Sequence, residues 1–388
     1  MDNIAIVVIG YDRLHCIERL LKSLDRAVYD DCIDLIISID NSGNEDLYKY
    51  VKEFNWKFGN KTVIIRSERL GLKKHVIECG NLTKEYEYIV VLEDDTYVSP
   101  YFYNYTKQAI KFYENNENIA GISLYKHKRN IDASKVFENE KNEFDSFFIQ
   151  YAQSWGQVWS RKEWNNFMEW YNKNGDSFEY SNKVPSNLFQ WSNKSWLKYH
   201  IRYCIENNKY FVYPNISHSS NFNNMGSHAI ANSPAYQTDL MYGKKEYKFM
   251  PFNKNAIKYD SFFEREDLGD MLGIDRGELC IDIYGMKQNK ENKKYWLTTR
   301  LEDFRIIKSF GLELKPHEMN VINQIEGNGI FLYDTSIIEK NYIKSKIHRY
   351  NSHLYYQGEA NKGDLLEYTK FKYTEWLKYV IKRIKKLK

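Results

Sequence analysis

The chain has 388 residues, of which 43% are hydrophobic and 28% charged, with a formal net charge of +4. This length and composition predict about two domains with real hydrophobic cores and exclude an intrinsically disordered chain. No segment approaches the roughly 18 consecutive apolar residues of a membrane-spanning helix, and the N-terminus does not resemble a secretory signal, so we expect a cytoplasmic protein. The five cysteines are scattered singly without Cys-x-x-Cys spacing, which predicts reduced structural thiols.

The first hundred residues alternate short apolar runs with amphipathic segments. Strands are predicted at 4–10, 35–39, 63–65 and 88–92, and helices at 14–24, at 45–54 and after Gly71. This β/α series predicts an α/β fold with a mostly parallel sheet flanked by helices. Ligands of such sheets bind at the carboxyl ends of the strands, so we expect the loops there to converge on one crevice.

The pattern changes twice further along the chain. Residues 144–228 are rich in aromatic side chains, which suit the apolar faces of sugars as well as a half-buried core layer. After about residue 260, strands are predicted at 279–284, 295–299 and 329–333 and a helix at 301–309, in an α/β or α+β extension. We therefore predict a first domain over 1–245 and an accessory domain over 246–365. The accessory domain could serve acceptor binding, partner docking or dimerisation, and a homodimer is one expectation.

The basic charge of the chain lies at its carboxyl end. Residues 370–388 contain eight lysines and arginines against one glutamate, a local charge of +7, which leaves −3 for the remaining residues. Because the residues outside 370–388 have no excess positive charge, nucleic acid is not expected as a partner. Apolar residues recur at helical spacing in this tail, so we predict an amphipathic helix over 366–388 on the anionic inner face of the cell membrane, with a helix packed on the body as the alternative.

A triplet of carboxylates, Glu93-Asp94-Asp95, ends the fourth predicted strand. Three adjacent anions repel one another, so the arrangement persists most readily where a divalent metal, with a bound phosphate behind it, neutralises them. A solvated acidic turn is the alternative. The position of the triplet at the expected crevice favours the metal site.

The other loops of the crevice offer groups that suit a nucleoside diphosphate. Arg13 and Arg66 or Arg69 can fork onto phosphate oxygens, and Asp40 can accept a hydrogen bond from the ring nitrogen of a pyrimidine. Glu93 or Asp94 can accept from ribose hydroxyls. No GxxxxGK phosphate loop is present, so metal and arginine would neutralise the phosphates and kinase or GTPase chemistry is not expected.

Seven pieces of sequence stand in one order within the first 230 residues. They are Val8-Ile-Gly10-Tyr-Asp12-Arg13, Ser38-Ile-Asp40-Asn41, Arg69-Leu-Gly71-Leu, Val91-Leu-Glu93-Asp94-Asp95, Trp155-Gly156, Ser195-Trp196, and Tyr213-Pro-Asn215-Ile-Ser217 continuing to Met225-Gly-Ser227-His228. In this order they resemble GT-A fold glycosyltransferases of the N-acetylglucosaminyltransferase I type and bacterial enzymes that assemble surface polysaccharides.

The resemblance implies a role for each matching position. It implies that Asp40 contacts the base, Arg13 the diphosphate, Glu93 and Asp94 the nucleoside, and Asp95 a manganese or magnesium ion. Asp12 is a further predicted nucleotide-binding residue. It also implies that Ser227 and His228 lie on a loop that closes over the phosphates, with His228 as a second metal ligand, and that the acceptor side is formed by Trp155, Gly156, Asn193 and Trp196.

One segment departs from the family pattern. Inverting members place a carboxylate just before the Trp of the acceptor-side segment to deprotonate the attacking hydroxyl, whereas Asn193, Lys194 and Ser195 precede Trp196. Either another carboxylate, such as Glu163 or Asp176, acts as the base, or the reaction retains configuration without one. We favour inversion.

The predicted function is metal-dependent transfer of a hexose or N-acetylhexosamine from a UDP-sugar to a lipid-linked saccharide in bacterial surface-polysaccharide synthesis. One alternative is a sugar nucleotidyltransferase, which would carry a Gly-rich loop with Arg and Lys after the first strand, and Gly10-Tyr-Asp-Arg13 is not one. The other is a catalytically silent carbohydrate-binding or scaffold protein, for which the missing carboxylate before Trp196 is the best evidence.

Overall fold

The computed structural model describes residues 3–175, 177–222, 224, 236–342, 366, 369, 370, 372–374, 376 and 377. Contacts divide the chain into two units, Met1–Asn341 and Tyr342–Lys388. Among the described helices, none combines the length and the hydrophobicity that crossing a bilayer requires.

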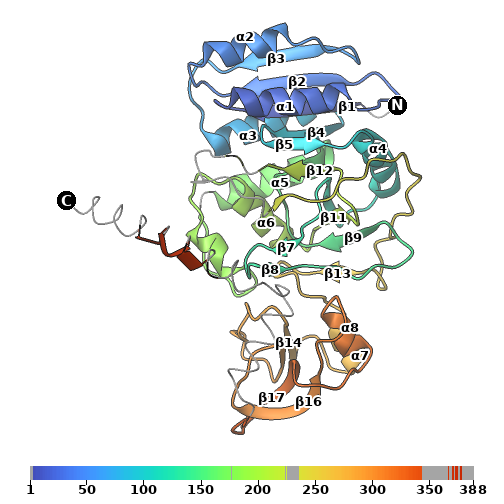
Figure 1. The fold of residues 1–388 in the computed structure, drawn as a ribbon, viewed down its shortest axis with the longest axis vertical. Helices are drawn as coiled ribbons and strands as arrows, with labels where there is room; N and C mark the ends of the chain where they lie inside the picture. The colour runs from blue at the N-terminus through green and yellow to red at the C-terminus, as the bar shows by residue number, and fades with distance from the viewer. Residues whose placement is uncertain are drawn as a thin grey trace, which may run out of the picture. The chain divides into compact units, whose positions relative to one another are not determined.

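A nine-stranded sheet in the order β13-β9-β11-β6-β10-β4-β1-β2-β3 runs through the larger unit (Figure 1). Its strands are β1 Ile4–Gly10, β2 Asp34–Ile39, β3 Lys61–Ile65, β4 Tyr88–Glu93, β6 Ile119–Ser123, β9 Ser146–Ile149, β10 Gln157–Ser160, β11 Tyr210–Pro214 and β13 Lys258–Tyr259. Strands β1 to β4 are mutually parallel, as the β/α pattern predicts. Strand β13 adds to this sheet from beyond the predicted domain boundary at 245.

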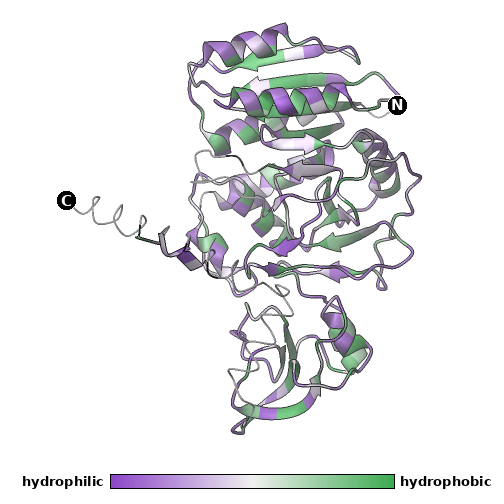
Figure 2. Cartoon of the chain, in the orientation of Figure 1, coloured by the Kyte–Doolittle hydropathy of each residue, from purple (hydrophilic) through white to green (hydrophobic). Residues whose placement is uncertain are grey.

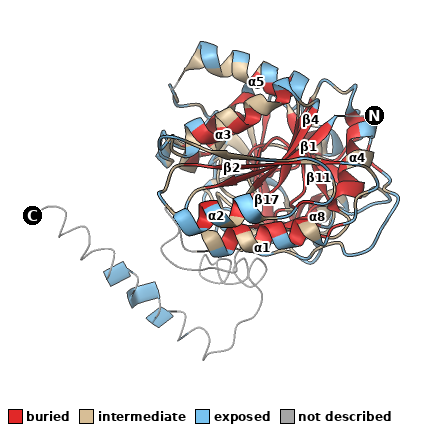
Figure 3. Ribbon diagram, turned by 90° about the horizontal axis from the view of Figure 1, so that it is seen from above, coloured by how far each residue is buried: buried red, intermediate tan, exposed pale blue. Residues whose placement is uncertain are grey.

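Helices cover both faces of this sheet. They are α1 Leu14–Asp25, α2 Glu45–Glu53, α3 Leu72–Gly80, α4 Phe102–Tyr113, α5 Arg161–Asn174 and α6 Leu197–Glu206, with short 3-10 helices η1 Asn81–Lys84 and η2 Ser186–Gln190. Figure 3 shows α1 and α2 on one face and α3 and α5 on the other. Buried residues of α1 recur every three or four positions, and Figure 2 shows its alternating hydrophobic and hydrophilic stripes.

Strand β10 runs opposite to its neighbours on both sides. Gln157 pairs with Val91 of β4 and with Ser123 of β6, and both pairings are antiparallel. Strands β4 and β6 are therefore parallel to each other, and their carboxyl ends lie at the same edge, about 10 Å apart at two strand spacings. The loops after β1, β2, β3, β4 and β6 and the loop before β10 lie at this edge. The predicted α/β fold is confirmed, and this is the edge at which the sequence predicts a ligand-binding crevice.

Two small ribbons extend this edge. Strand β5, Thr96–Val98, begins directly after the acidic triplet and pairs antiparallel with β12, Ser219–Asn221. Strands β7 Arg129–Asn130 and β8 Lys135–Val136 form a hairpin in the connection that follows β6. Residues distant in sequence are thereby brought beside the carboxyl ends of β4 and β6.

A second sheet has the order β14-β15-β17-β16. Its strands are β14 Leu279–Asp282, β15 Tyr295–Thr298, β17 Ile330–Ile338 and β16 Phe304–Phe310, and helices α7 Leu268–Leu272 and α8 Glu318–Ile322 accompany them. Leu268, Leu297, Phe310, Val321 and Ile330 share its core. The helix predicted at 301–309 is wrong: β16 forms there because its aromatic and β-branched residues pair along β17, and this tertiary pairing overrides the helical spacing.

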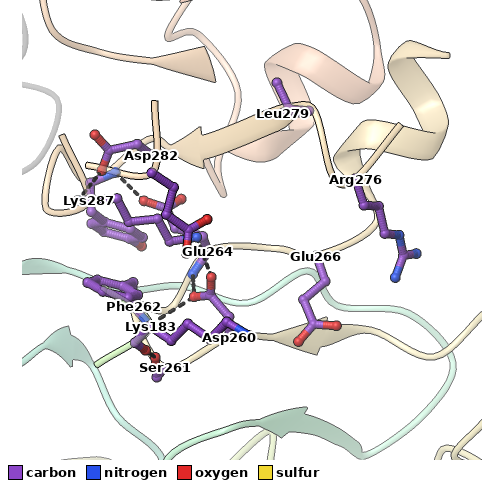
Figure 4. Close-up of polar contacts among 12 residues, drawn as sticks. Lys183, Asp260, Ser261, Phe262, Glu264, Glu266, Arg276, Leu279, Asp282 and Lys287 are labelled. Carbon is purple, nitrogen blue, oxygen red and sulfur yellow. Dashed lines mark hydrogen bonds and ion pairs between the residues drawn. The ribbon is translucent and has the colours of Figure 1, made fainter. Parts of the chain in front are cut away.

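A buried ionic network joins the segment after β13 to the segment after β14 (Figure 4). Lys287 forms an ion pair with Asp260, and Asp282 accepts a hydrogen bond from the Lys287 backbone at 2.8 Å. Glu264, 2% exposed, accepts from the Tyr284 backbone at 2.7 Å. Burial raises the pKa of Glu264 well above its usual value, although Lys287 opposes this shift.

In the smaller unit, the described positions between 366 and 377 are helical and exposed. The rings of Tyr373 and Trp376 stack with their centroids 6.0 Å apart. The remainder of the predicted terminal helix lies outside the described residues, and its binding to a membrane stays a prediction.

Candidate active site

Arg13 holds the acidic triplet at the carboxyl end of β4. Its guanidinium forms an ion pair with Asp94, with Arg13 Nε donating to Asp94 Oδ2 at 3.1 Å, and its Nη2 lies 3.3 Å from Asp95 Oδ2. Asn221 of β12 donates from its amide to Asp95 Oδ1 at 2.9 Å. The loop after β1 and the end of β4 thus meet as the sequence predicts, while Asn221 carries no motif that could have marked it.

The triplet carries more negative charge than Arg13 neutralises. Burial, and then repulsion from Asp95 and Asp94, raises the pKa of Glu93 to about 8. Burial also raises the pKa of Asp94 to about 6, although Arg13 beside it acts in the opposite direction. Burial alone would lower the pKa of Arg13, but Asp94 and Asp95 raise it. Burial is the main cause of both raised pKa values, and repulsion within the triplet adds to it against the opposing effect of Arg13.

These residues suit a divalent cation that is shared with another anion. The described residues include no group of three or more His, Cys, Asp or Glu side chains that could hold a metal by themselves. Asp95, with 15% of its side chain exposed, can contribute one carboxylate, and phosphate oxygens would complete the shell, as is usual for Mg²⁺ bound with a diphosphate. Oxygen ligands also suit Mn²⁺.

Asp40 lies at the carboxyl end of β2 and is 3% exposed. Its Oδ1 accepts hydrogen bonds from the backbone of Asn41 at 2.9 Å and Leu70 at 2.8 Å, and its Oδ2 accepts from Gly71 at 2.9 Å. Asp40 therefore anchors the turn that leads into α3, a structural role that the sequence does not reveal. Its predicted contact with a nucleobase stays a prediction and would use the remaining lone pair of Oδ2.

The other predicted nucleotide-binding residues border the same edge. Arg69 is exposed and lies over the ring of Tyr11, 4.8 Å from its centroid. Asp12 is exposed and accepts from the Asn44 amide at 2.9 Å. Arg66, by contrast, donates to Ser38 at 3.3 Å and pairs with Glu78 of α3 at 3.5 Å. Arg69 is therefore the better placed of the two arginines to receive a phosphate.

Trp196 is a buried residue near the acidic triplet. It is 3% exposed, packs edge-on against Trp159 at a centroid distance of 5.4 Å, and lies close enough to Glu93 to lower the pKa of that carboxyl. Asn193 is exposed and accepts from Lys198 at 2.7 Å. Trp196 thus links the segment before α6 to the acidic triplet, which supports its predicted place beside the donor site.

Trp155 lies two residues before β10, within an aromatic cluster. Its ring centroid lies 4.8 Å from Tyr125, 4.7 Å from Tyr236 and 5.8 Å from His127. The adjacent Gly156 has φ +95°, and a Cβ there would lie 2.8 Å from Ser219 Oγ, so this turn requires glycine. Trp155 thus packs against Tyr125 and Tyr236, and the acceptor role of Trp155 and Gly156 stays a prediction.

The structure contradicts Glu163 as a catalytic base. Its helix α5 follows Ser160, which pairs with Tyr88 at the beginning of β4, whereas the triplet lies at the end of that strand, about 17 Å away at 3.3 Å per residue. Glu163 instead accepts from Lys209 at 3.0 Å and from Tyr203 at 3.2 Å. The other predicted base, Asp176, and the loop residues Ser227 and His228 lie outside the described residues.

Residues 5–167 match the family model described as glycosyl transferase family 2. This match covers the strands and loops that bring together Arg13, Asp40 and the acidic triplet. Residues 5–167 are therefore similar to this glycosyltransferase family, and the mostly parallel sheet agrees with the GT-A arrangement. No curated protein matches the sequence.

Several solved structures are similar to this chain. TarS 1–349 of S. aureus has 12% sequence identity and a TM-score of 0.36, and the match covers 56% of this chain and 59% of that one. The same protein in complex with UDP-GlcNAc has 12% identity, a TM-score of 0.34, and covers 58% and 60%. The mannosyltransferase PcManGT from Pyrobaculum calidifontis, in complex with GDP-Man and Mn²⁺, has 12% identity, a TM-score of 0.33, and covers 55% and 57%.

The matched region spans about 60% of the length of these proteins. Their identities and TM-scores are too low to carry an argument about the substrate of this chain.

Proposed function

We propose that this chain is a metal-dependent glycosyltransferase that moves a hexose or N-acetylhexosamine from a UDP-sugar to a lipid-linked saccharide acceptor with inversion. The observation that carries the proposal is the under-neutralised carboxylate triplet beside Arg13 at the carboxyl end of β4. It lies within the part of the chain that matches glycosyl transferase family 2. Bacterial surface-polysaccharide synthesis at the inner face of the cell membrane is the setting we propose.

Each wall of the crevice would act on one part of the reaction. Arg13 and Arg69 would bind the diphosphate, and Glu93 and Asp94 the nucleoside. A divalent ion held through Asp95 would supply Lewis-acid stabilisation of the departing diphosphate. Aromatic rings around Trp155 would hold the acceptor sugar against the donor and exclude water from the reacting centre.

UDP release, measured for a panel of UDP-sugars with and without Mn²⁺, tests this function. We expect turnover that depends on Mn²⁺, and the variant Asp95→Asn should lose the metal-dependent component of UDP binding. Asp46→Asn is the matched control because Asp46 is an exposed carboxylate on α2. Absence of both turnover and Mn²⁺-dependent UDP binding in the unmodified chain would refute the enzyme and leave the carbohydrate-binding scaffold.

A further inference from the structure

A cavity of about 570 Å³ opens beside the connection that follows β6. Lysines enter its lining from three parts of the chain: Lys126 and Lys128 follow β6, Lys141 follows β8, and Lys315 precedes α8. Sites that bind small molecules usually have volumes of about 300–1,000 Å³. This cavity, called the lysine cavity below, is therefore large enough for a ligand and is rich in cations.

The lining of the lysine cavity carries more positive than negative charge. Its carboxylates among the described residues are Glu138, Glu140 and Asp239. Glu140 forms an ion pair with Arg265, which lies outside the lining, and Asp239 pairs with Lys128 at 3.1 Å. The other charged side chains of the described lining are three lysines against one glutamate, which leaves an excess of two positive charges.

Lys126 is partly buried in this lining. None of the ion pairs among the described residues includes it, so its ammonium group is available to a ligand. Burial, and then repulsion from Lys141, lowers the pKa of Lys126 to about 8, with Lys128 adding to the shift and Glu138 opposing it. An anion in the cavity would bind an ammonium group that is already in place and would relieve the repulsion among the lysines.

The lysine cavity also offers apolar surface. Val136, Pro316 and Met319 line it and are half-buried, so that part of each side chain stays accessible. A sugar ring presents hydroxyl groups at its rim and C–H groups on its faces, and these faces gain dispersion contacts on apolar side chains. Lysines beside apolar side chains therefore suit a saccharide that carries an anionic group better than they suit a free inorganic anion.

The lysine cavity lies near the edge of the sheet that carries the acidic triplet. The Lys126 backbone donates to Ser217 Oγ at 2.7 Å. Four residues further along the chain, Asn221 donates to Asp95 at 2.9 Å. Four residues span at most about 14 Å. An oligosaccharide that lies with one end at the acidic triplet can therefore reach the lysine cavity with a more distant unit.

The lysine cavity also adjoins the aromatic cluster around Trp155. Lys126 directly follows Tyr125, and Asp239 comes three residues after Tyr236. The Tyr125 hydroxyl donates to the Tyr236 carbonyl at 2.9 Å, and the ring centroids of the two tyrosines lie 4.8 and 4.7 Å from Trp155. Because Trp155 is predicted on the acceptor side, the cavity is placed to receive a distal part of the acceptor.

We propose that the lysine cavity binds a phosphate or carboxylate group that the acceptor saccharide carries a few sugar units from its reacting hydroxyl. Lys126 and Lys141 supply the charge that recognises this anion, and the apolar side chains contact the sugar that carries it. The cavity selects the acceptor and takes no part in making or breaking bonds. That the bound saccharide is the acceptor rests on the proposed function.

Calorimetric titration of the full chain, with UDP and Mn²⁺ present, tests this site with three hexasaccharide probes. Maltohexaose is uncharged, phosphorylated maltohexaose carries phosphate, and hexagalacturonate carries carboxylates. We expect one charged probe to bind at least about tenfold more tightly than maltohexaose, the lower range for one hydrogen bond to a charged group. The tighter of the two charged probes identifies the anion, and its advantage should shrink as the salt concentration rises.

The double variant Lys126→Gln with Lys141→Gln should lose this preference, while its UDP–Mn²⁺ affinity stays within twofold of that of the unmodified chain. The matched control, Lys49→Gln with Lys111→Gln, removes the same charge from exposed positions on α2 and α4 and should keep the preference. Melting temperatures check folding. If the first double variant unfolds, Lys141→Gln alone replaces it, because Lys141 is exposed, and should weaken binding of the charged probe selectively.

The outcomes separate this inference from the proposed function. UDP release from the donor panel is measured for the same protein. Turnover without any preference for a charged probe, or an equal loss of the preference in both double variants, would overturn the anion site and leave the transferase. A preference that depends on Lys126 and Lys141 in a chain without turnover would overturn the acceptor assignment together with the proposed function, and would leave a saccharide-binding protein.

Discussion

Replacing Asp40 tests whether one carboxylate holds the turn at the mouth of the crevice. Its two oxygens accept three backbone N–H groups, from Asn41, Leu70 and Gly71, at 2.8 to 2.9 Å. Hydrogen bonds to a charged group contribute roughly 1.5–3 kcal/mol each and are not additive. Because the site is 3% exposed, water cannot replace them without movement of the turn, and we expect Asp40→Ala to cost on the order of 3–5 kcal/mol.

Asp40→Asn refines the same test. An amide oxygen at Oδ1 can still accept from Asn41 and Leu70, but the amide NH₂ then faces the N–H of Gly71, donor against donor. We therefore expect a loss of roughly half that of Asp40→Ala. Asp12→Ala is the matched control because Asp12 is exposed and, among the described residues, accepts from Asn44 alone, so its loss should stay below about 1 kcal/mol.

Urea unfolding monitored by circular dichroism provides the free energies, and hydrogen exchange reports the amides of Leu70 and Gly71 directly. Faster exchange at these two amides in Asp40→Ala is expected even under native conditions. If Asp40→Ala lost less than about 1 kcal/mol and both amides kept their protection, the anchoring role would be refuted. The carboxylate would then be free for the nucleobase contact that the sequence suggests.

Two further predictions concern buried charge elsewhere in the larger unit. Lys287→Met leaves the carboxylate of Asp260 without its counter-charge and should lower the free energy of unfolding, measured by thermal unfolding, by about 3–5 kcal/mol. The control Lys290→Met, at an exposed lysine, should change this free energy by less than about 1 kcal/mol. Equal effects of the two variants would contradict the network. Burial lowers the pKa of His75 to about 4, so its contribution to stability is fully present above pH 6.5 and is lost as the pH falls from 6.5 towards 4. His75→Gln should therefore flatten the dependence of the unfolding free energy on pH in this range, measured by urea unfolding at a series of pH values. An unchanged slope in this variant would count against the role of His75.

Hydrophobic periodicity was sufficient to predict the first half of the main sheet. The segments 4–10, 35–39 and 88–92 are buried strands that alternate with amphipathic helices, and this alternation is compatible with few topologies. In a parallel sheet the loops that follow the strands lie at one edge, so Arg13 after β1 lies close to Asp94 after β4. Periodicity was insufficient at 301–309, where pairing with β17 decides for a strand. Short apolar segments fit both patterns, and only the partner strand distinguishes them.

Contacts that depend on long-range pairing could not be predicted. Asn221 reaches Asp95 because β12 pairs with β5, and no local signal marks that register. Glu163 was a reasonable candidate by residue type, but the direction of β10 carries it to the other edge of the sheet.

The β5–β12 ribbon ties Asp95 to a distant part of the chain. Asp95 accepts from the Asn221 side chain through Oδ1 and from the Phe222 backbone through its carbonyl, at 2.9 and 3.0 Å. A cation that redirects the Asp95 carboxylate must therefore loosen or reinforce the grip on Asn221. Coupling between two sites is reciprocal, so a change that alters the Asn221–Asp95 hydrogen bond alters the affinity of Asp95 for a cation by the same free energy. Cation binding and the pairing of β12 with β5 are therefore thermodynamically linked.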